Sequence, residues 1–219
     1  MNPSAHVLPE IWLLTGIVAY GALVLWALAG IDRRRLQREP LRQHLLLGGS
    51  VAVMVLWLVR SSMVMPEIGL HVLGMTALTL LVGWRQALVG SLLPVLGPVL
   101  VGAEPWQMAG LSGLALAALP IGITHLVWRI TQRLLPRNLF VYLFVCTLCG
   151  SALAAALARV AAMALLAIAG TYTLAAISHD QLVLLSLLLL PESLVNVAAI
   201  AALAAWRPQW LITLRPNLT

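Results

Sequence analysis

The sequence contains no lysine and very little charge of either sign. Of its 219 residues, 13 are basic, all of them arginine, and 7 are acidic. A phosphate-binding loop of the G-x-x-x-x-G-K type is therefore excluded, and neither an H-E-x-x-H zinc motif nor a paired-carboxylate arrangement occurs. We expect a protein that is not an enzyme and that cannot hydrolyse ATP by itself.

Cysteine is almost absent too. The two cysteines, Cys146 and Cys149, form a C-T-L-C sequence inside the apolar run Phe140–Ala158. A spacing of three residues places them on one face of a helix, which suits a redox or metal pair. The favoured interpretation is plainer: two small residues that line a contact between helices.

Long apolar runs dominate what remains. Hydrophobic residues make up 62% of the chain and charged residues 9%, and the mean hydropathy is +1.00. Runs such as Leu45–Val59 and Gln181–Trp206 approach the roughly 20 residues that a helix needs to cross a bilayer. The sequence therefore predicts an all-α, polytopic membrane protein, with residues 1–219 forming a single integral membrane domain in the lipid bilayer. The net charge of +6 does not indicate nucleic-acid binding, because the arginines flank apolar runs.

The runs predict about seven transmembrane helices. Their expected ranges are Glu10–Gly30, Leu45–Met65, Leu70–Gly83, Ala87–Ala103, Gln107–Trp128, Leu139–Arg159 and Gln181–Trp206. The apolar stretch continues past Arg159 to Gly170, so the sixth run exceeds one bilayer thickness. We therefore expect a break near Gly150 or Arg159, followed by a helix in or near the outer interface.

The arginines predict the orientation. Eleven of the thirteen fall in the first, third and fifth loops or after the last span, namely Arg33, Arg34, Arg35, Arg38, Arg42, Arg85, Arg129, Arg133, Arg137, Arg207 and Arg215. Because positive loops stay in the cytoplasm, the N-terminus is expected outside and the C-terminus inside. The exceptions, Arg60 and Arg159, are expected to reach the outer interface or to pair with Glu67 or Asp180.

With this topology, several potential metal ligands gather on the outer face. His6 precedes the first span, Glu67 lies in the second loop, and His71 opens the third span one helical turn before Met75. Imidazole binds divalent transition metals, and thioether sulfur favours softer ions such as Cu⁺. Met63 and Met65 would add soft ligands near His71. An interfacial role for the histidines without a metal remains open.

Glu192 is the other notable polar residue. It lies in the apolar sequence L-L-P-E-S-L-V-N, with Asn196 four residues later on the same helix face. A carboxylate at membrane depth is costly, so it is either functional or pairs helices. His44 and His125 are interpreted as interfacial, and His179 with Asp180 could join a metal path from the outer loop.

Taken in order, these segments resemble the CbiM-like permeases, from about Glu67 onward. The resemblance rests on Gly69–Leu88 with its H-x-L-G sequence, on Gly110–Pro120, on Asn138–Gly150, and on L-P-E-S-L-V-N with the closing W-R-P-Q-W. It indicates a divergent branch of that family. The resemblance implies a substrate-binding membrane component of an energy-coupling-factor transporter for cobalt or nickel, in a bacterial inner (cytoplasmic) membrane. Its partners would be a transmembrane coupling subunit and cytoplasmic ATPase subunits.

The resemblance also implies a metal site. In better-known members a Met-His N-terminus folds into the outer cavity and, with the histidine of H-x-L-G, binds the ion in a plane; His71 is the matching histidine. This chain departs from the pattern: Asn2 and Pro3 begin it, and His6 is the nearest histidine. Pro3 has no N–H to deprotonate, and Ser112 stands where those members carry an asparagine.

The predicted ligands are therefore His71, His6, Glu67 and Met75, for transported Co²⁺ or Ni²⁺ rather than Cu⁺ or Zn²⁺. Two further hypotheses follow from the residues. The ion could be copper, because methionines cluster near His71. Alternatively, the chain is an accessory or structural subunit of a larger membrane-protein complex and carries no metal, since the N-terminal pattern is altered.

Overall fold

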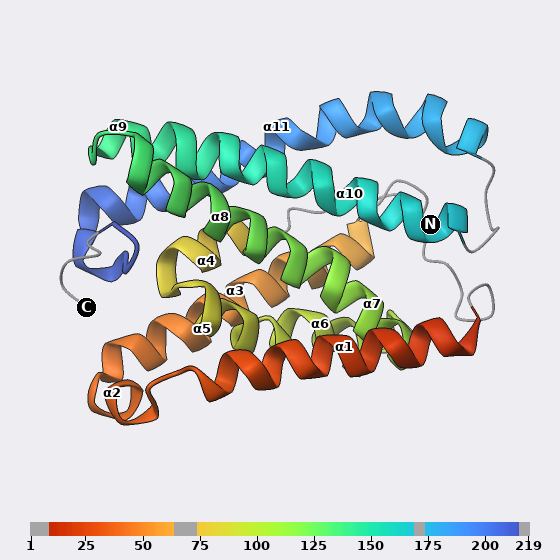
Figure 1. Cartoon of the computed structure of the whole chain (residues 1–219), viewed down its shortest axis with the longest axis horizontal. Helices are drawn as coiled ribbons and strands as arrows, with labels where there is room; N and C mark the ends of the chain where they lie inside the picture. The colour runs from red at the N-terminus through yellow and green to blue at the C-terminus, as the bar shows by residue number, and fades with distance from the viewer. Residues whose placement is uncertain (1–8, 64–73, 169–173, 215–219) are drawn as a thin grey trace.

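The structure is a bundle of helices that run mostly along one long axis (Figure 1). The computed structural model describes residues 9–63, 74–168 and 174–214, and gives no side-chain detail for residues 35, 59–63, 166–168 and 174–188. Every regular element in these ranges is a helix. Five of the helices are long and apolar enough to cross a membrane. An all-α, polytopic membrane protein is thus confirmed.

The elements follow the chain in this order: α1 (Glu10–Ala29), α2 (Arg33–Arg38), α3 (Pro40–Met63), α4 (Met75–Val82), α5 (Trp84–Gly90), α6 (Leu92–Leu100), η2 (Trp106–Met108), α7 (Ala109–Ser112), η3 (Gly113–Ala118), α8 (Leu119–Leu134), α9 (Leu139–Val141), η4 (Tyr142–Cys149), α10 (Gly150–Ile168), α11 (Leu174–Trp206) and η5 (Pro208–Trp210).

Five of the predicted spans correspond to long helices. The candidate membrane-crossing segments are Glu10–Ala29, Pro40–Leu58, Trp106–Leu134, Leu139–Leu165 and Leu189–Trp206. They match the first, second, fifth, sixth and seventh predicted spans. Helices are expected here because lipid offers the backbone no hydrogen-bonding partner.

The third and fourth predicted spans are represented by shorter helices. Of the range 70–83, the described part is α4, whose eight residues extend only about 12 Å. The chain then reverses at Gly83, with a φ of +83° that glycine adopts without strain. It returns through α5 and α6, which meet at Ser91. Seven crossings remain a prediction, because residues 64–73 lie outside the described ranges.

The predicted break near Gly150 or Arg159 is wrong. The chain stays helical from Leu139 to Ile168, and its bonding changes from α-helical to π-helical at Tyr142 and back to α-helical at Gly150. The Thr147 side-chain hydroxyl donates to the carbonyl of Tyr142, five residues earlier, within the π-helical segment. Small residues at the buried positions of α10, such as Ala154 and Ala158, let this long helix pack without interruption.

Helix α4 occupies the centre of the bundle. It packs against α3, α8, α10 and α11, and all its residues except Ala77 are buried. Figure 1 shows α4 between α8, which lies above it, and α1, which lies below it. The short helix is therefore surrounded by long ones.

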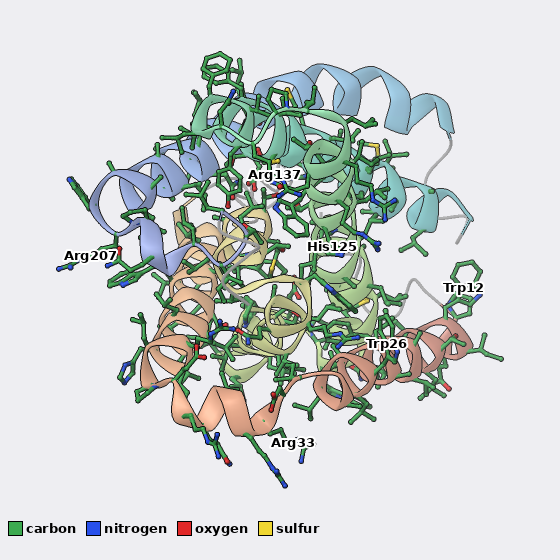
Figure 2. The ribbon with its side chains drawn as sticks, turned by 60° about the vertical axis from the view of Figure 1, so that its left-hand side comes forward. Trp12, Trp26, Arg33, His125, Arg137 and Arg207 are labelled. Atoms are coloured by element: carbon green, nitrogen blue, oxygen red, sulfur yellow. The ribbon has the colours of Figure 1, made fainter. Side chains whose placement is uncertain are left out.

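The described arginine side chains, Arg159 excepted, gather at one end of the bundle. We call this the arginine-rich end; it comprises residues 30–42, 83–86, 129–138 and 207–214. A shared pocket joins its first two segments, and the indole of Trp128, the residue just before the third segment, donates a hydrogen bond to the Thr213 carbonyl of the fourth. Figure 2, with this end turned toward the viewer, labels Arg33, Arg137 and Arg207. The single-sided distribution matches the sequence prediction.

Glycine allows α1 and α7 to approach closely. A Cβ atom added to Gly110 would lie 2.2 Å from the backbone nitrogen of Ile17 and 2.4 Å from the carbonyl carbon of Gly16. One added to Gly16 would lie 2.8 Å from the Leu111 side chain. Small residues at such crossings let helices pack backbone to backbone in a membrane.

We therefore expect Gly110→Ala to lower stability by about 1–3 kcal/mol, because the added methyl group meets backbone that cannot rotate away. Gly122→Ala is the matched control: a Cβ at Gly122 meets nothing within 4 Å, and alanine favours a helix over glycine. Thermal unfolding in detergent should separate the two variants. Equal melting temperatures would contradict the close α1–α7 contact.

Candidate functional site

The predicted metal ligands are only partly within the described structure. His6, Glu67, His71 and Met65 lie outside the described residues, and for Met63, Arg60, His179 and Asp180 the structure gives no side chain. Met75 is described: it opens α4 and is fully buried in the main apolar core. Among the described residues, no group of three or more His, Cys, Asp or Glu side chains could hold a metal ion.

The H-x-L-G sequence ends where α4 begins. Gly74 is the N-cap residue, with φ +63° in the left-handed region, a conformation that costs glycine nothing. Its carbonyl accepts the first helical bond, from Leu78 N–H at 3.1 Å. Having no side chain, Gly74 cannot cap its own helix, so the first N–H groups of α4 need partners from elsewhere.

Glu192 and Asn196 of α11 supply those partners. The Gly74 N–H donates to Glu192 Oε1 at 3.2 Å, and the Ala77 N–H donates to Asn196 Oδ1 at 2.8 Å. In a capping box the N-cap and N3 residues satisfy the same two N–H groups with their own side chains. Here a second helix provides both acceptors, so the cap of α4 is built in trans.

The two capping side chains also hold each other. Asn196 Nδ2 donates to Glu192 Oε1 at 2.7 Å and to the Glu192 backbone carbonyl at 2.8 Å. Glu192 is 3% exposed and Asn196 1%. Because Asn196 stands one turn after Glu192, the i,i+4 spacing orients both toward α4. The sequence interpretation that Glu192 pairs helices agrees with this geometry.

Arg159 of α10 is the charged neighbour of this pair. It lies close enough to Glu192 for their opposite charges to interact. A carboxylate in a low-dielectric interior is strongly penalised unless a positive charge or good hydrogen bonds compensate. Sequence reasoning named Glu67 and Asp180 as partners of Arg159 and missed Glu192, since the two residues are 33 positions apart.

Threonines extend the polar surroundings of this end of α4. The Thr76 and Thr124 hydroxyls are 2.9 Å apart, between α4 and α8, and both residues are buried. Thr79 donates to the Met75 carbonyl. The first turn of α4 thus contacts polar groups from α8 and α11 within an otherwise apolar core. Ser112, half-buried at the end of α7, lies on a helix that packs on α1 and α6.

The opposite end of α4 is closed by the segment that follows α11. The Ile212 N–H donates to the Leu81 carbonyl at 3.2 Å, and the Thr213 hydroxyl donates to the Leu80 carbonyl at 2.6 Å. Tyr142 lies 2.6 Å from the Thr213 hydroxyl; it must be the donor, because the Thr213 proton is already used. Both ends of α4 therefore depend on residues 192–213.

The cysteines do not form a paired site. Cys146 is fully buried, whereas Cys149 is exposed, and both are free thiols. The prediction that they share one helix face is wrong, because they lie in the π-helical segment η4, where each turn is wider than in an α-helix. Only Cys146 has the buried position expected of a helix-contact residue.

The interfacial interpretation of two histidines agrees with the structure. His44 is exposed near the start of α3. His125 lies between Trp84 and Trp128, with ring centroids 5.6 Å from each. The Trp26 ring lies 5.1 Å from that of Trp84 in a tilted arrangement, so these four rings form a chain near the arginine-rich end.

We expect Glu192→Leu to destabilise the protein by about 1–3 kcal/mol, because Gly74 N–H and Asn196 then lose a buried acceptor. Glu192→Gln retains an amide oxygen for both donors and should lose less stability. The remaining loss would arise because the positive charge of Arg159 no longer has a carboxylate beside it. Ser193→Ala is the control, because among the described residues its hydroxyl bonds only the Leu189 carbonyl of its own helix. The melting temperature of each variant is measured in detergent. If both Glu192 variants melt at the same temperature as Ser193→Ala, the carboxylate does not cap α4.

The comparison with known families covers nearly the whole chain. The family model CbiM, described as "Cobalt uptake substrate-specific transmembrane region", matches residues 4–210. That range includes α4, the capping pair on α11 and η5. A search of curated proteins and a search of solved structures each returned no match. The family is one of transporter membrane components rather than enzymes. By this match the chain belongs to the CbiM family of cobalt uptake transmembrane regions.

Proposed function

We propose that this protein is the subunit that binds Co²⁺ or Ni²⁺ on the outer side of a bacterial inner membrane for an energy-coupling-factor transporter. The observation that supports the proposal most directly is the fixed start of α4. The family match indicates cobalt uptake, and the α4 cap anchors the glycine that ends H-x-L-G.

His71 is the proposed principal ligand. It stands three residues before Gly74, and three residues of chain span at most about 11 Å in any conformation. The cap that Glu192 and Asn196 form on α4 therefore limits the distance between His71 and the start of α4. Imidazole nitrogen is a suitable donor for Co²⁺ and Ni²⁺, which prefer it to the soft thioether of methionine.

His6, Glu67 and Met75 are the proposed additional ligands. Because Pro3 lacks an amide N–H, the N-terminal backbone cannot bind the ion there as an amide nitrogen, and His6 would act through its ring instead. Glu67 would contribute an oxygen ligand. Met75 is fully buried at the first turn of α4, so its thioether would contact the ion from the interior of the bundle.

Transport would need further subunits. The chain has no lysine and no nucleotide-binding motif, so we propose that a transmembrane coupling subunit and cytoplasmic ATPase subunits supply the energy. The arginine-rich end would face the cytoplasm and those ATPases. The start of α4 would then face outward, because Glu192 precedes the end of α11 at Trp206 by fourteen residues, or about 21 Å.

Calorimetry on the purified full chain tests the metal site. We expect Co²⁺ or Ni²⁺ to bind with a 1:1 stoichiometry, and His71→Ala to weaken binding by about 100-fold or more, since a lost ligand is rarely replaced. His6→Ala should weaken it less. His44→Ala is the control, because His44 is exposed at the arginine-rich half of α3.

Two results would contradict the proposal. One is the absence of binding by Co²⁺, Ni²⁺, Zn²⁺ and Cu⁺; the other is unchanged affinity in His71→Ala. Co-purification with an unrelated membrane complex, together with no metal binding, would favour the accessory-subunit hypothesis. Binding of Cu⁺ alone would favour the copper alternative.

Orientation is tested separately with reporters. A reporter fused after Thr219 should be cytoplasmic, and one inserted at Glu104 should be outside, because the arginines collect at the opposite end from Glu104. A reporter found on the opposite side of the membrane at either position would overturn the predicted orientation. This measurement does not test the metal site.

A further inference from the structure

One face of α8 combines apolar and positively charged side chains. Leu126, Ile130 and Leu134 are exposed and recur every four residues, so they form one stripe along the helix. Arg129 and Arg133 are also exposed, and each comes one residue before an apolar member of the stripe. Because α8 belongs to a candidate membrane-crossing segment that ends at Leu134, the stripe faces lipid and the arginines lie where the segment leaves the hydrocarbon.

Neither arginine has a carboxylate partner. Among the described residues, Arg129 and Arg133 form no ion pair. The elements that pack closely on α8 are α4, α5, α10, η3 and η4, and none of these, nor α8 itself, contains an aspartate or a glutamate. At the surface of a bilayer, the phosphates of anionic lipids are the negative groups that such arginines can reach.

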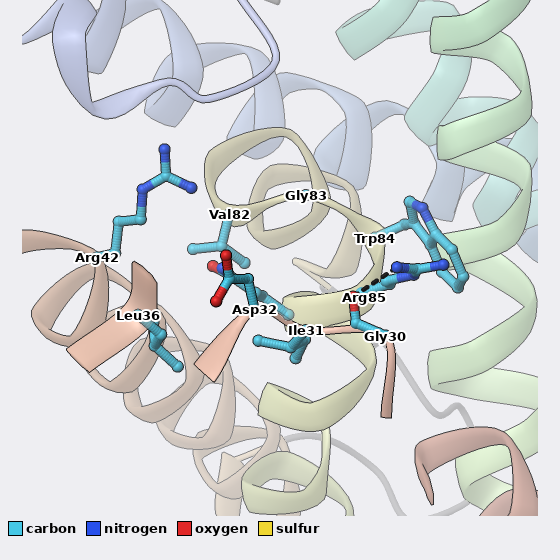
Figure 3. Close-up of a pocket in the computed structure, with 10 residues that line it drawn as sticks. Gly30, Ile31, Asp32, Leu36, Arg42, Val82, Gly83, Trp84 and Arg85 are labelled. Carbon is cyan, nitrogen blue, oxygen red and sulfur yellow. Dashed lines mark hydrogen bonds between the residues drawn. The ribbon is translucent and has the colours of Figure 1, made fainter. Parts of the chain in front are cut away.

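The arginines of two neighbouring helices are engaged differently. Arg42 of α3 and Arg85 of α5 line a pocket of about 220 Å³ at the turn from α4 to α5 (Figure 3). Arg42 pairs with Glu39, and the Arg85 guanidinium donates to the Gly30 carbonyl. Of the arginine side chains described on α3, α5 and α8, those of α8 are therefore the ones left for a ligand from outside the chain.

The spacing of the two α8 arginines suits a ligand with two phosphates. Four residues separate Arg129 from Arg133, which places them on one face and about 6 Å apart along the helix axis. A guanidinium binds a phosphate through two parallel N–H···O bonds. Cardiolipin carries two phosphates joined by a single glycerol, so each arginine can bind one of them. It has no ammonium group, which would need a carboxylate that this face does not offer.

A gap in the stripe offers room for an acyl chain. Gly122 continues the four-residue spacing of the stripe and is exposed, and a Cβ atom there would meet nothing within 4 Å. It lies seven residues before Arg129, or about 10 Å along the helix. Half of the hydrocarbon core of a bilayer is about 15 Å thick. An acyl chain whose phosphate is at Arg129 therefore passes the gap within its own leaflet.

We propose that this face of α8 binds cardiolipin at the arginine-rich end. Its two phosphates accept from Arg129 and Arg133, and one acyl chain lies along Leu126 and over Gly122. Trp128 marks the same depth, because tryptophan is enriched at membrane interfaces and its indole donates to the Thr213 carbonyl at this end. None of these residues belongs to the metal site proposed above.

Native mass spectrometry of the full chain in detergent tests the site with cardiolipin, phosphatidylglycerol and phosphatidylethanolamine. We expect cardiolipin to bind about fivefold more tightly than phosphatidylglycerol, because it engages a second arginine, and phosphatidylethanolamine to bind most weakly. Arg129→Gln and Arg133→Gln should each remove the preference for cardiolipin. The control is Arg33→Gln, which removes the same charge from the exposed helix α2 at the same end and should leave the preference unchanged.

The acyl contact is tested by filling the gap. Gly122→Leu should weaken the binding of cardiolipin and phosphatidylglycerol alike, because both place an acyl chain there. Unchanged binding of both lipids would contradict this part of the proposal. Arg129 and Arg133 are exposed, so without added lipid their variants should melt at the wild-type temperature.

Three results would overturn the proposal. A preference for cardiolipin that survives in both Arg129→Gln and Arg133→Gln would arise from its four acyl chains rather than from its phosphates. An equal loss of preference in Arg33→Gln would show that only the overall charge matters. Equal binding of all three lipids by the wild type would favour a protein partner for these arginines.

Discussion

The fold depends on how the ends of one short buried helix are satisfied. Every α-helix leaves four N–H and four C=O groups without partners inside the helix, so α4, with eight residues, has as many such groups as residues. Water is not present in the core of a bilayer to take them. The chain solves this with one continuous stretch, from Glu192 on α11 to Thr213 after it, which bonds both ends of α4.

This constraint accounts for the polar residues in an apolar interior. Glu192 is tolerated because it accepts from Gly74 and Asn196 and lies beside Arg159. Tyr142 is used to orient the Thr213 hydroxyl toward the Leu80 carbonyl. None of these groups has to bind a substrate to be required. Their structural role is to hold in place Gly74, the residue that ends H-x-L-G.

Much of the fold could be predicted from hydropathy and arginine positions, because both reflect the membrane directly. The long helices and the gathering of arginines at one end follow from those patterns. The short α4 could not be predicted, since its length is set by partners on α11 that are more than a hundred residues away. The i,i+4 pair Glu192 and Asn196 did signal a buried contact, but no local pattern identifies Gly74, Ala77 or Arg159 as its neighbours. The π-helical segment at Cys146 also had no sequence signal.

The double attachment of α4 has a mechanical consequence. Both ends of α4 are bonded to α11 and the residues that follow it. Neither helix can therefore slide along the other without breaking hydrogen bonds that lipid would not replace. Any rearrangement of the bundle that keeps these hydrogen bonds must therefore take place at the surfaces where other helices pack on this pair. Gly83, whose φ of +83° glycine adopts without strain, marks the point where the chain leaves this pair for α5 and α6.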